Sequence, residues 1–205
     1  MGKYKEYKSN ENDKELDWEM LEVEHVIKDD WIDLRKVKYR FPDGVTFSPY
    51  YNYTRSDYVV IVATDEAGNY LTVRQYRHGI RACTNEFPAG KIDVNVDRDL
   101  DKRATPLADE ELSLHAAKRE LLEETGCESE DWEKMIVVPS CATINDNFAY
   151  VYRAKNCKRV AKQNLDDSEF LNVRKISESE LVEMIKEGEF EQSVHVMAYY
   201  MSKQF

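Results

Sequence analysis

One stretch of this chain specifies its own conformation more strongly than any other: residues 113–125, SLHAAKRELLEET. Good helix formers fill it, and Leu114, Ala117 and Leu121 recur at the three- and four-residue spacing of a helix with one apolar face. Gly126 follows directly, and glycine is the residue type that most often ends a helix. The pattern predicts an amphipathic helix over residues 113–125 that packs on a core.

The same helix carries three glutamates on one side. Glu123 and Glu124 follow Glu120 by three and four residues, so the three carboxylates share a helix face. Packed carboxylates repel one another at neutral pH, and a hard divalent cation bound through their oxygens relieves that repulsion. A solvated acidic surface is the alternative, and composition by itself favours it. Other parts of the sequence are needed to distinguish a metal-binding face from a solvated one.

Around this helix the chain alternates β-prone runs with turn residues. Pro42-Asp43-Gly44 separates two such runs, which predicts a hairpin, and the turn at 65–69 joins a second pair. Residues 177–180, SESE, fit a capping box that opens a helix ending at Gly188, and a last short helix is expected at 192–202. This order predicts an α/β sandwich on a mixed sheet. The expected strands are residues 31–39, 45–53, 58–64, 70–76, 134–138, 148–153 and 169–176.

Two charged stretches lack any apolar periodicity. Residues 1–17 predict a flexible tail without a site. Residues 93–108 predict a surface loop, in which Thr105-Pro106 would open an early helical turn.

Composition excludes several classes of protein. The 205 residues suffice for one sizeable core with an accessory layer. The longest apolar runs, at 58–63 and 135–139, are far shorter than the ~20 residues that span a bilayer. The N-terminus lacks the apolar core of a secretory signal. A net charge of −11 disfavours general nucleic-acid binding, and four cysteines outside any C-x-x-C pair indicate reduced thiols. We therefore expect a cytoplasmic protein without membrane or nucleic-acid partners.

Residues 119–127, RELLEETGC, with Glu111 eight residues before Arg119 and the string NEFPAG at 85–90, resemble the Nudix box, G-x₅-E-x₇-R-E-U-x-E-E-x-G-U, where U is a bulky apolar residue. Everything from Glu111 to Cys127 matches in register. The box glycine departs, because position 105 is threonine and the matching glycine is Gly90, which leaves 15 extra residues before Glu111. A surface loop tolerates such an insertion at modest entropic cost. The chain is thus identified as a member of the Nudix hydrolase superfamily.

Flanking strings resemble the ADP-ribose and ADP-sugar pyrophosphatase subgroup. They are QYR at 75–77, EFPAGKID at 86–93 and DSEF at 167–170. The likeness runs from about Trp31 to the C-terminus. It implies a Nudix-type α/β/α sandwich with a mixed sheet, plus an N-terminal antiparallel β extension. We therefore expect a tail at 1–17, a dimerising β extension at 18–55 and a Nudix hydrolase domain at 56–205.

The resemblance assigns the acidic helix to metal binding. It places Mg²⁺ or Mn²⁺ on Glu120 and Glu124, with Glu123 assisting and the carbonyl of Ala89 as a backbone ligand. Arg119 would position these carboxylates through salt bridges. In such sites the cation screens the diphosphate and lowers the pKa of a bound water that attacks phosphorus.

A base must still accept the proton of that water. Many bacterial relatives use a glutamate in a loop where this chain has Ile144-Asn145-Asp146-Asn147, and asparagine cannot serve. Similar eukaryotic enzymes take the base from the later D-G-E-F-like segment, which points to Glu169, with Asp146 in reserve. An ordinary surface carboxylate at a strand edge is the alternative for Glu169.

The resemblance also suggests substrate contacts. Arg77 would bind a phosphate or ribose, because a guanidinium fork matches paired phosphate oxygens, and Arg55 would be a second phosphate contact. An ordinary surface arginine is the alternative for Arg77. Glu86 would contact a metal-bound water or the ribose. Trp31 and Tyr50 would sandwich adenine, often across a dimer interface, although a core tryptophan is the commoner explanation. We assign no role to the four histidines, His25, His78, His115 and His195.

Together these features predict a Mg²⁺-dependent pyrophosphohydrolase. It would work as a homodimer and cleave ADP-ribose or a related nucleoside diphosphate sugar into a nucleoside monophosphate and a sugar phosphate. The alternative is a Nudix-like module that senses a nucleotide sugar without hydrolysing it. The insertion and the missing loop glutamate favour that alternative, and the complete set of carboxylates disfavours it.

Overall fold

The computed structural model describes residue 13, residues 15–94 and residues 104–204. The described chain divides into two compact units. One comprises the described residues of 1–56, 94–107 and 139–148, and the other those of 57–93, 108–138 and 149–205. The described residues of 94–107 and 139–148 group with the N-terminal unit. The division expected at 55/56 and the dimerising role of the extension stay predictions. Most of the expected tail and residues 95–103 of the expected loop lie outside the described residues.

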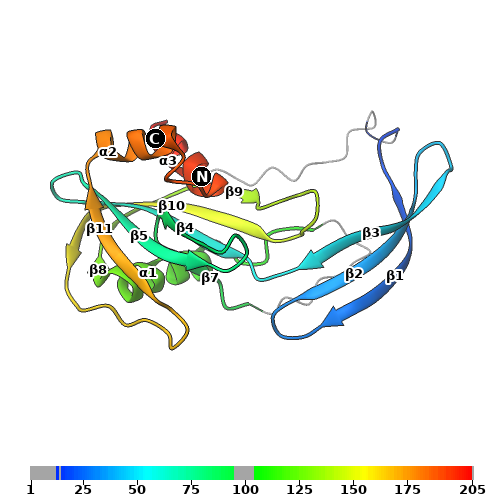
Figure 1. The fold of residues 1–205 in the computed structure, drawn as a ribbon, viewed down its shortest axis with the longest axis horizontal. Helices are drawn as coiled ribbons and strands as arrows, with labels where there is room; N and C mark the ends of the chain where they lie inside the picture. The colour runs from blue at the N-terminus through cyan, green and yellow to red at the C-terminus, as the bar shows by residue number, and fades with distance from the viewer. Residues whose placement is uncertain (1–12, 14, 95–103, 205) are drawn as a thin grey trace. The chain divides into compact units, whose positions relative to one another are not determined.

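The N-terminal unit contains a three-stranded antiparallel sheet in the order β1-β2-β3 (Figure 1). Its strands are β1 (Glu19–Lys28), β2 (Asp33–Arg40) and β3 (Thr46–Thr54). The hairpin of β2 and β3 confirms the prediction, whereas β1 was not predicted. β1 alternates acidic residues with apolar ones at the sheet edge, and its glutamates pair across to β2. These cross-strand pairs are Glu24–Lys36, Glu22–Lys38 and Glu19–Arg40.

The other face of this sheet is aromatic. Val37 and Tyr39 alternate with Lys36 and Lys38 along β2, so they point to the side opposite the ion pairs. Neighbouring ring centroids there lie 4.6–6.4 Å apart. The rings belong to Trp18, Tyr39, Phe41, Phe47 and Tyr50.

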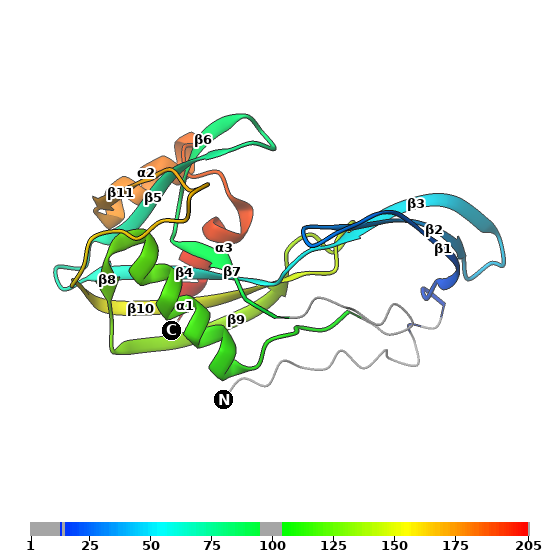
Figure 2. The ribbon, with the colours of Figure 1, turned by 90° about the horizontal axis from the view of Figure 1, so that it is seen from below.

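The second unit contains a mixed sheet between helices. Strands follow the order β11-β5-β4-β10-β8, with β6 on β5, β7 on β4 and β9 on β10. The pair β4–β10 is parallel, and the pairs β10–β8, β11–β5, β4–β5, β4–β7 and β5–β6 are antiparallel. In Figure 2, α1 lies on one side of the sheet and α2 and α3 on the other. The elements are β4 (Tyr58–Asp65), β5 (Tyr70–Arg77), β6 (Ala82–Glu86), β7 (Ala89–Lys91), α1 (Glu110–Thr125), β8 (Cys127–Glu128), β9 (Asp131–Pro139), β10 (Phe148–Arg159), β11 (Leu171–Ile176), α2 (Glu178–Glu187) and α3 (Ser193–Ser202).

The core occupies both faces of this sheet. Val60 and Val62 of β4 belong to an apolar cluster with Leu181 of α2 and Ala198 of α3. Their neighbours on β4 point to the opposite face, where α1 buries Leu121. Helices on both faces of a mixed sheet confirm the predicted α/β/α sandwich.

Residues 82–91 form a wedge between β4 and β5. These two strands pair with each other only near their shared turn, at Ala63–Leu71 and Thr64–Tyr70. Beyond that point β6 pairs with β5 and β7 pairs with β4, so the segment that carries Glu86, Ala89 and Gly90 fills the space between them. We call residues 82–91 the wedge segment. β6 and β7 were not predicted, because each is too short to show alternation.

Most helix and strand predictions are confirmed, with shifted ends. α1 begins at Glu110 rather than residue 113, because the Asp109 side chain accepts the Leu112 N–H, and Thr105-Pro106 is not helical. Gly126 and Gly188 end α1 and α2 in the left-handed conformation, and the Ser177 side chain caps α2 as the capping pattern predicted. β10 extends to Arg159, and β11 begins at Leu171, which leaves Glu169 in the preceding loop.

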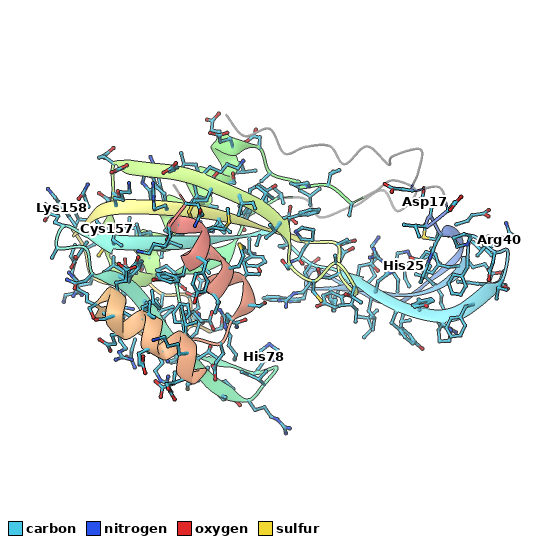
Figure 3. The ribbon with its side chains drawn as sticks, turned by 90° about the horizontal axis from the view of Figure 1, so that it is seen from above. Asp17, His25, Arg40, His78, Cys157 and Lys158 are labelled. Carbon is cyan, nitrogen blue, oxygen red and sulfur yellow. The ribbon has the colours of Figure 1, made fainter. Side chains whose placement is uncertain are left out.

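The four cysteines are free. Cys127 and Cys157 are buried, and Cys83 and Cys141 are exposed. Figure 3 shows Cys157 next to Lys158 near one end of the mixed sheet, and His78 at the hairpin between β5 and β6. No helix in the described part of the chain is long and apolar enough to cross a membrane.

Candidate active site

The acidic edge of α1 faces the protein interior. Glu120 and Glu124 are only 5% and 2% exposed, and Glu123 is half-buried. Arg119 lies between two of the carboxylates, with Nη2 2.8 Å from Glu120 and Nη1 2.7 Å from Glu123. Its Nη2 also donates to the carbonyl of Lys91 at 3.0 Å. The helix therefore brings together the four residues that the box pattern singled out, and the arginine orients two of them.

The end of the wedge segment packs directly on these carboxylates. The Ala89 N–H donates to Glu124 at 3.1 Å. Gly90 lies so close to Glu120 that an added Cβ would stand 1.9 Å from the carboxyl carbon. A larger residue at position 90 would have to displace the Glu120 carboxylate, which supports the assignment of Gly90 as the box glycine despite the insertion.

Burial makes the negative charge of this edge unfavourable. It raises the pKa of Glu120 to about 7, since repulsion by Glu123 and Glu169 adds to desolvation and outweighs the attraction of Arg119. Burial and repulsion by Glu120 raise the pKa of Glu124 well above its ordinary value. Arg119 thus offsets only part of the negative charge of these carboxylates.

A divalent cation suits this arrangement. Two carboxylates that disfavour each other's ionised state supply oxygen ligands of the kind that hard cations prefer. The described residues contain no group of three or more His, Cys, Asp or Glu side chains arranged to hold a metal ion. The carboxylates instead lie against Arg119 and the Ala89 N–H, so a cation would have to displace or share these partners.

The buried Glu86 forms an ion pair with the half-buried Arg77. The Arg77 Nε donates to Glu86 Oε1 at 2.7 Å, and its Nη2 contacts Oε2. Thr84 and Gln192 also donate to Glu86. Burial by itself would raise the pKa of Glu86, but the Arg77 hydrogen bond and the nearby His195 lower it below the ordinary value. Arg77 and Glu86, both predicted to contact the substrate, therefore bind each other in this structure.

His195 of α3 supports the wedge segment, and sequence reasoning missed it. Its ring is buried, stacks on Phe87 with 9° between the planes, and accepts the Phe87 N–H at Nδ1 over 3.0 Å. Its Nε2 lies 3.9 Å from Glu86. Burial lowers the pKa of His195 to about 4 despite the attraction of Glu86, so the ring is neutral at pH 7. No local pattern signals this role, because the partner is 108 residues away.

Glu169 acts electrostatically on the acidic edge. Its charge raises the pKa of both Glu120 and Glu124, so its carboxylate lies within electrostatic reach of them. The reserve candidate, Asp146, is in the N-terminal unit, where Arg35 Nη2 donates to it at 3.0 Å and Thr54 Oγ1 at 2.6 Å. Asp146 is thus held by Arg35 and Thr54 within the N-terminal unit.

The remaining predicted substrate contacts are in the N-terminal unit. Trp31, with 78% of its surface exposed, and Arg55 line one pocket of about 390 Å³ there. Asp29 shapes this pocket, because its side chain accepts the N–H groups of Trp31 and Ile32. Tyr50 does not line this pocket and packs in the aromatic cluster instead.

The chain is similar to known proteins. The family model NUDIX domain matches residues 54–198. The chain is 30% identical over 141 residues to a methanol dehydrogenase activator of Bacillus methanolicus, covering 68% of each chain. It is 34% identical over 104 residues to an ADP-ribose pyrophosphatase of Mycobacterium tuberculosis, covering 51% of this chain and 44% of that one. It is 23% identical over 132 residues to an ADP-ribose pyrophosphatase of Bacillus subtilis, covering 64% and 63%.

A solved structure has the same fold. The crystal structure of an ADP compounds hydrolase superposes with a TM-score of 0.73 at 19% identity, over 92% of this chain and 94% of that one. The chain spans less than two thirds of the length of either pyrophosphatase. The chain belongs to the NUDIX domain family and is a Nudix hydrolase, as residues 111–127 indicated.

The buried imidazole of His195 predicts a pH-dependent stability. An unfolded chain protonates it near pH 6.5 and the folded protein only near pH 4, so the unfolded state binds more protons between these values. The free energy of unfolding should therefore fall as the pH is lowered through this window, by on the order of 3 kcal/mol from this residue. Urea unfolding of wild type and His195→Asn measures it. The variant should lose less stability, and equal losses would contradict the assignment.

Proposed function

We propose that this Nudix hydrolase is a divalent-metal-dependent pyrophosphohydrolase. Its substrate would be ADP-ribose or a related nucleoside diphosphate sugar, and its products a nucleoside monophosphate and a sugar phosphate. The observation that carries this proposal is the pair of buried carboxylates, Glu120 and Glu124, held against Ala89-Gly90 with Glu169 in electrostatic reach. Two relatives named ADP-ribose pyrophosphatase support the substrate class.

Nudix hydrolases generally use divalent metal ions, and we propose Mg²⁺ or Mn²⁺ here. Glu120 and Glu124 would hold the ion, with Glu123 and the carbonyl of Ala89 contributing. When bound, the cation screens the negative diphosphate and lowers the pKa of a coordinated water. It would also offset the repulsion that now raises the pKa of both buried glutamates.

The chain's own residues would complete the reaction. Arg119 holds Glu120 and Glu123 in a fixed orientation, which keeps the acidic edge ready for the cation. Glu169 would accept the proton of the attacking water, because it combines reach of the acidic edge with partial exposure. Arg77 would contact a substrate phosphate or ribose, with Glu86 orienting its guanidinium.

The N-terminal unit would contribute to adenine recognition and dimer formation. Trp31 offers an exposed ring beside Arg55, a combination suited to a base next to a phosphate. The aromatic face of the β1–β3 sheet supports a homodimer, because Trp18 and Phe47 remain about half exposed on it. Tyr50 would belong to that interface through its ring cluster. The cytoplasmic location stays a prediction.

One relative favours a second function. The Bacillus methanolicus protein is named for activating a methanol dehydrogenase. A Nudix-like module that binds a nucleotide sugar and signals to a partner would therefore be the alternative. The buried carboxylates count against a purely binding role, since their burial is unfavourable without a task such as holding a cation.

Hydrolysis can be tested directly. The purified chain incubated with ADP-ribose and Mg²⁺ should release AMP, and chelation of the metal should stop it. Glu124→Gln keeps the size of the side chain and removes its charge, so it should lower turnover by about 10³-fold or more. Chromatography of released mononucleotide is the measurement. Tight calorimetric binding with no product over hours would instead support the binding module, and full activity of Glu124→Gln would refute the metal assignment.

The base assignment has its own test. Glu169→Gln should lower kcat by about 10²-fold, because an amide cannot accept the proton, while KM stays nearly constant. Asp146→Asn is the matched comparison and should keep most of the activity. A large loss in Asp146→Asn with none in Glu169→Gln would reverse the assignment.

Dimer formation should depend on the aromatic face. Phe47→Asp places a charge among the rings and should shift the protein toward the monomer in sedimentation equilibrium. Lys38→Asp, on the ion-paired face of the same sheet, should leave the association state unchanged. A monomeric wild type would overturn the dimer proposal.

A further inference from the structure

The loop that carries Glu169 is fastened to the end of the acidic helix. We call residues 160–170 the Glu169 loop. Near its start, the N–H groups of Val160 and Ala161 donate to the Gly126 carbonyl at 2.9 and 3.1 Å. Further along, the Asn164 N–H donates to the Glu123 carbonyl at 2.9 Å, and the Gln163 side chain donates to the Glu124 carbonyl at 2.8 Å.

These bonds meet a requirement of the helix. The last carbonyls of any α-helix lack intrahelical partners. In α1 the Gly126 N–H satisfies Leu122, and the Glu169 loop satisfies the next two carbonyls. Those two belong to Glu123 and Glu124, so the loop is bonded to the backbone of the residues whose side chains form the acidic edge.

Beyond this tether, the position of Glu169 depends on one local turn. The Glu169 N–H donates to the Asp166 carbonyl at 2.9 Å, and the Asp166 N–H donates back to the Glu169 carboxylate at 3.2 Å. On the far side, β11 begins at Leu171 paired with Gln75 of β5. The turn is thus fixed at one end by α1 and at the other by the sheet.

The tether holds the Glu169 loop beside the acidic helix. The loop leaves β10 after Arg159 and enters β11 at Leu171, and between these strands it contacts α1 through Gln163 and Asn164. These hydrogen bonds limit how far the Glu169 turn can move away from the acidic edge.

We propose that Gln163 is a positioning residue for Glu169. Its side-chain amide bonds the Glu124 backbone and so sets the distance of the Glu169 turn from the carboxylates of α1. This inference rests on the proposed function only in taking Glu169 as the base. The hydrogen-bond geometry itself does not depend on the reaction.

Gln163→Met tests the proposal, because methionine keeps the length of the side chain and removes the donor. We expect kcat to fall by about 10- to 100-fold, since small displacements of a reacting group are costly, with little change in KM. In the Glu169→Gln background the same substitution should change kcat less than about twofold, because both act through one group. Asn164→Ala is the matched control: it keeps the backbone N–H of the tether and should behave as wild type.

Amide hydrogen exchange, followed by NMR, gives a readout that needs no turnover. The Asp166 and Asn164 amides should exchange faster in Gln163→Met than in wild type or Asn164→Ala. Unchanged exchange with unchanged kcat overturns the proposal. A loss of kcat that persists at full size in Glu169→Gln also overturns it, because the effect would then run through Glu124. An inactive wild type would refute the proposed function, and the exchange rates would still decide whether Gln163 holds the loop.

Discussion

The burial of two like-charged carboxylates where α1 meets the wedge segment governs the architecture of the site. Glu120 and Glu124 are taken out of water with one arginine between the acidic side chains and one backbone N–H on Glu124. Such an arrangement is stable only if the surrounding structure over-determines it. Gly90 allows the backbone to approach, and the sheet and α1 hold the two sides together.

The wedge segment links this acidic edge to a second buried charge. Glu86 lies on β6 and Ala89-Gly90 on β7, with Phe87 and Pro88 between them. The Arg77 hydrogen bond lowers the pKa of Glu86, whereas burial and mutual repulsion raise the pKa of Glu120 and Glu124 despite the Arg119 ion pair. His195 stays neutral beside Glu86, which leaves Arg77 as the cation that pairs with it. The wedge segment thus carries the ion-paired Glu86 only three residues before Ala89, which contacts the acidic edge of α1.

Sequence reasoning succeeded where the determining pattern is local. The stripe of α1, its glycine end and the capping serine of α2 each lie within a few residues of what they specify. It failed at β1, whose glutamates become favourable only opposite the lysines of β2. It also missed β6 and β7, because a three- or five-residue strand shows no period. His195 was missed because its partner Phe87 is distant in sequence.

The hydrogen bond between Phe87 and His195 has a consequence for biosynthesis. It joins positions 108 residues apart, and Gln192 donates to Glu86 across a similar separation. During translation the strands around the wedge leave the ribosome well before α3 does. Until α3 docks, the amide of Phe87 has no imidazole to accept it and Glu86 lacks part of its shell. A nascent chain halted before α3 would therefore present the wedge segment without the contacts that His195 and Gln192 make to it.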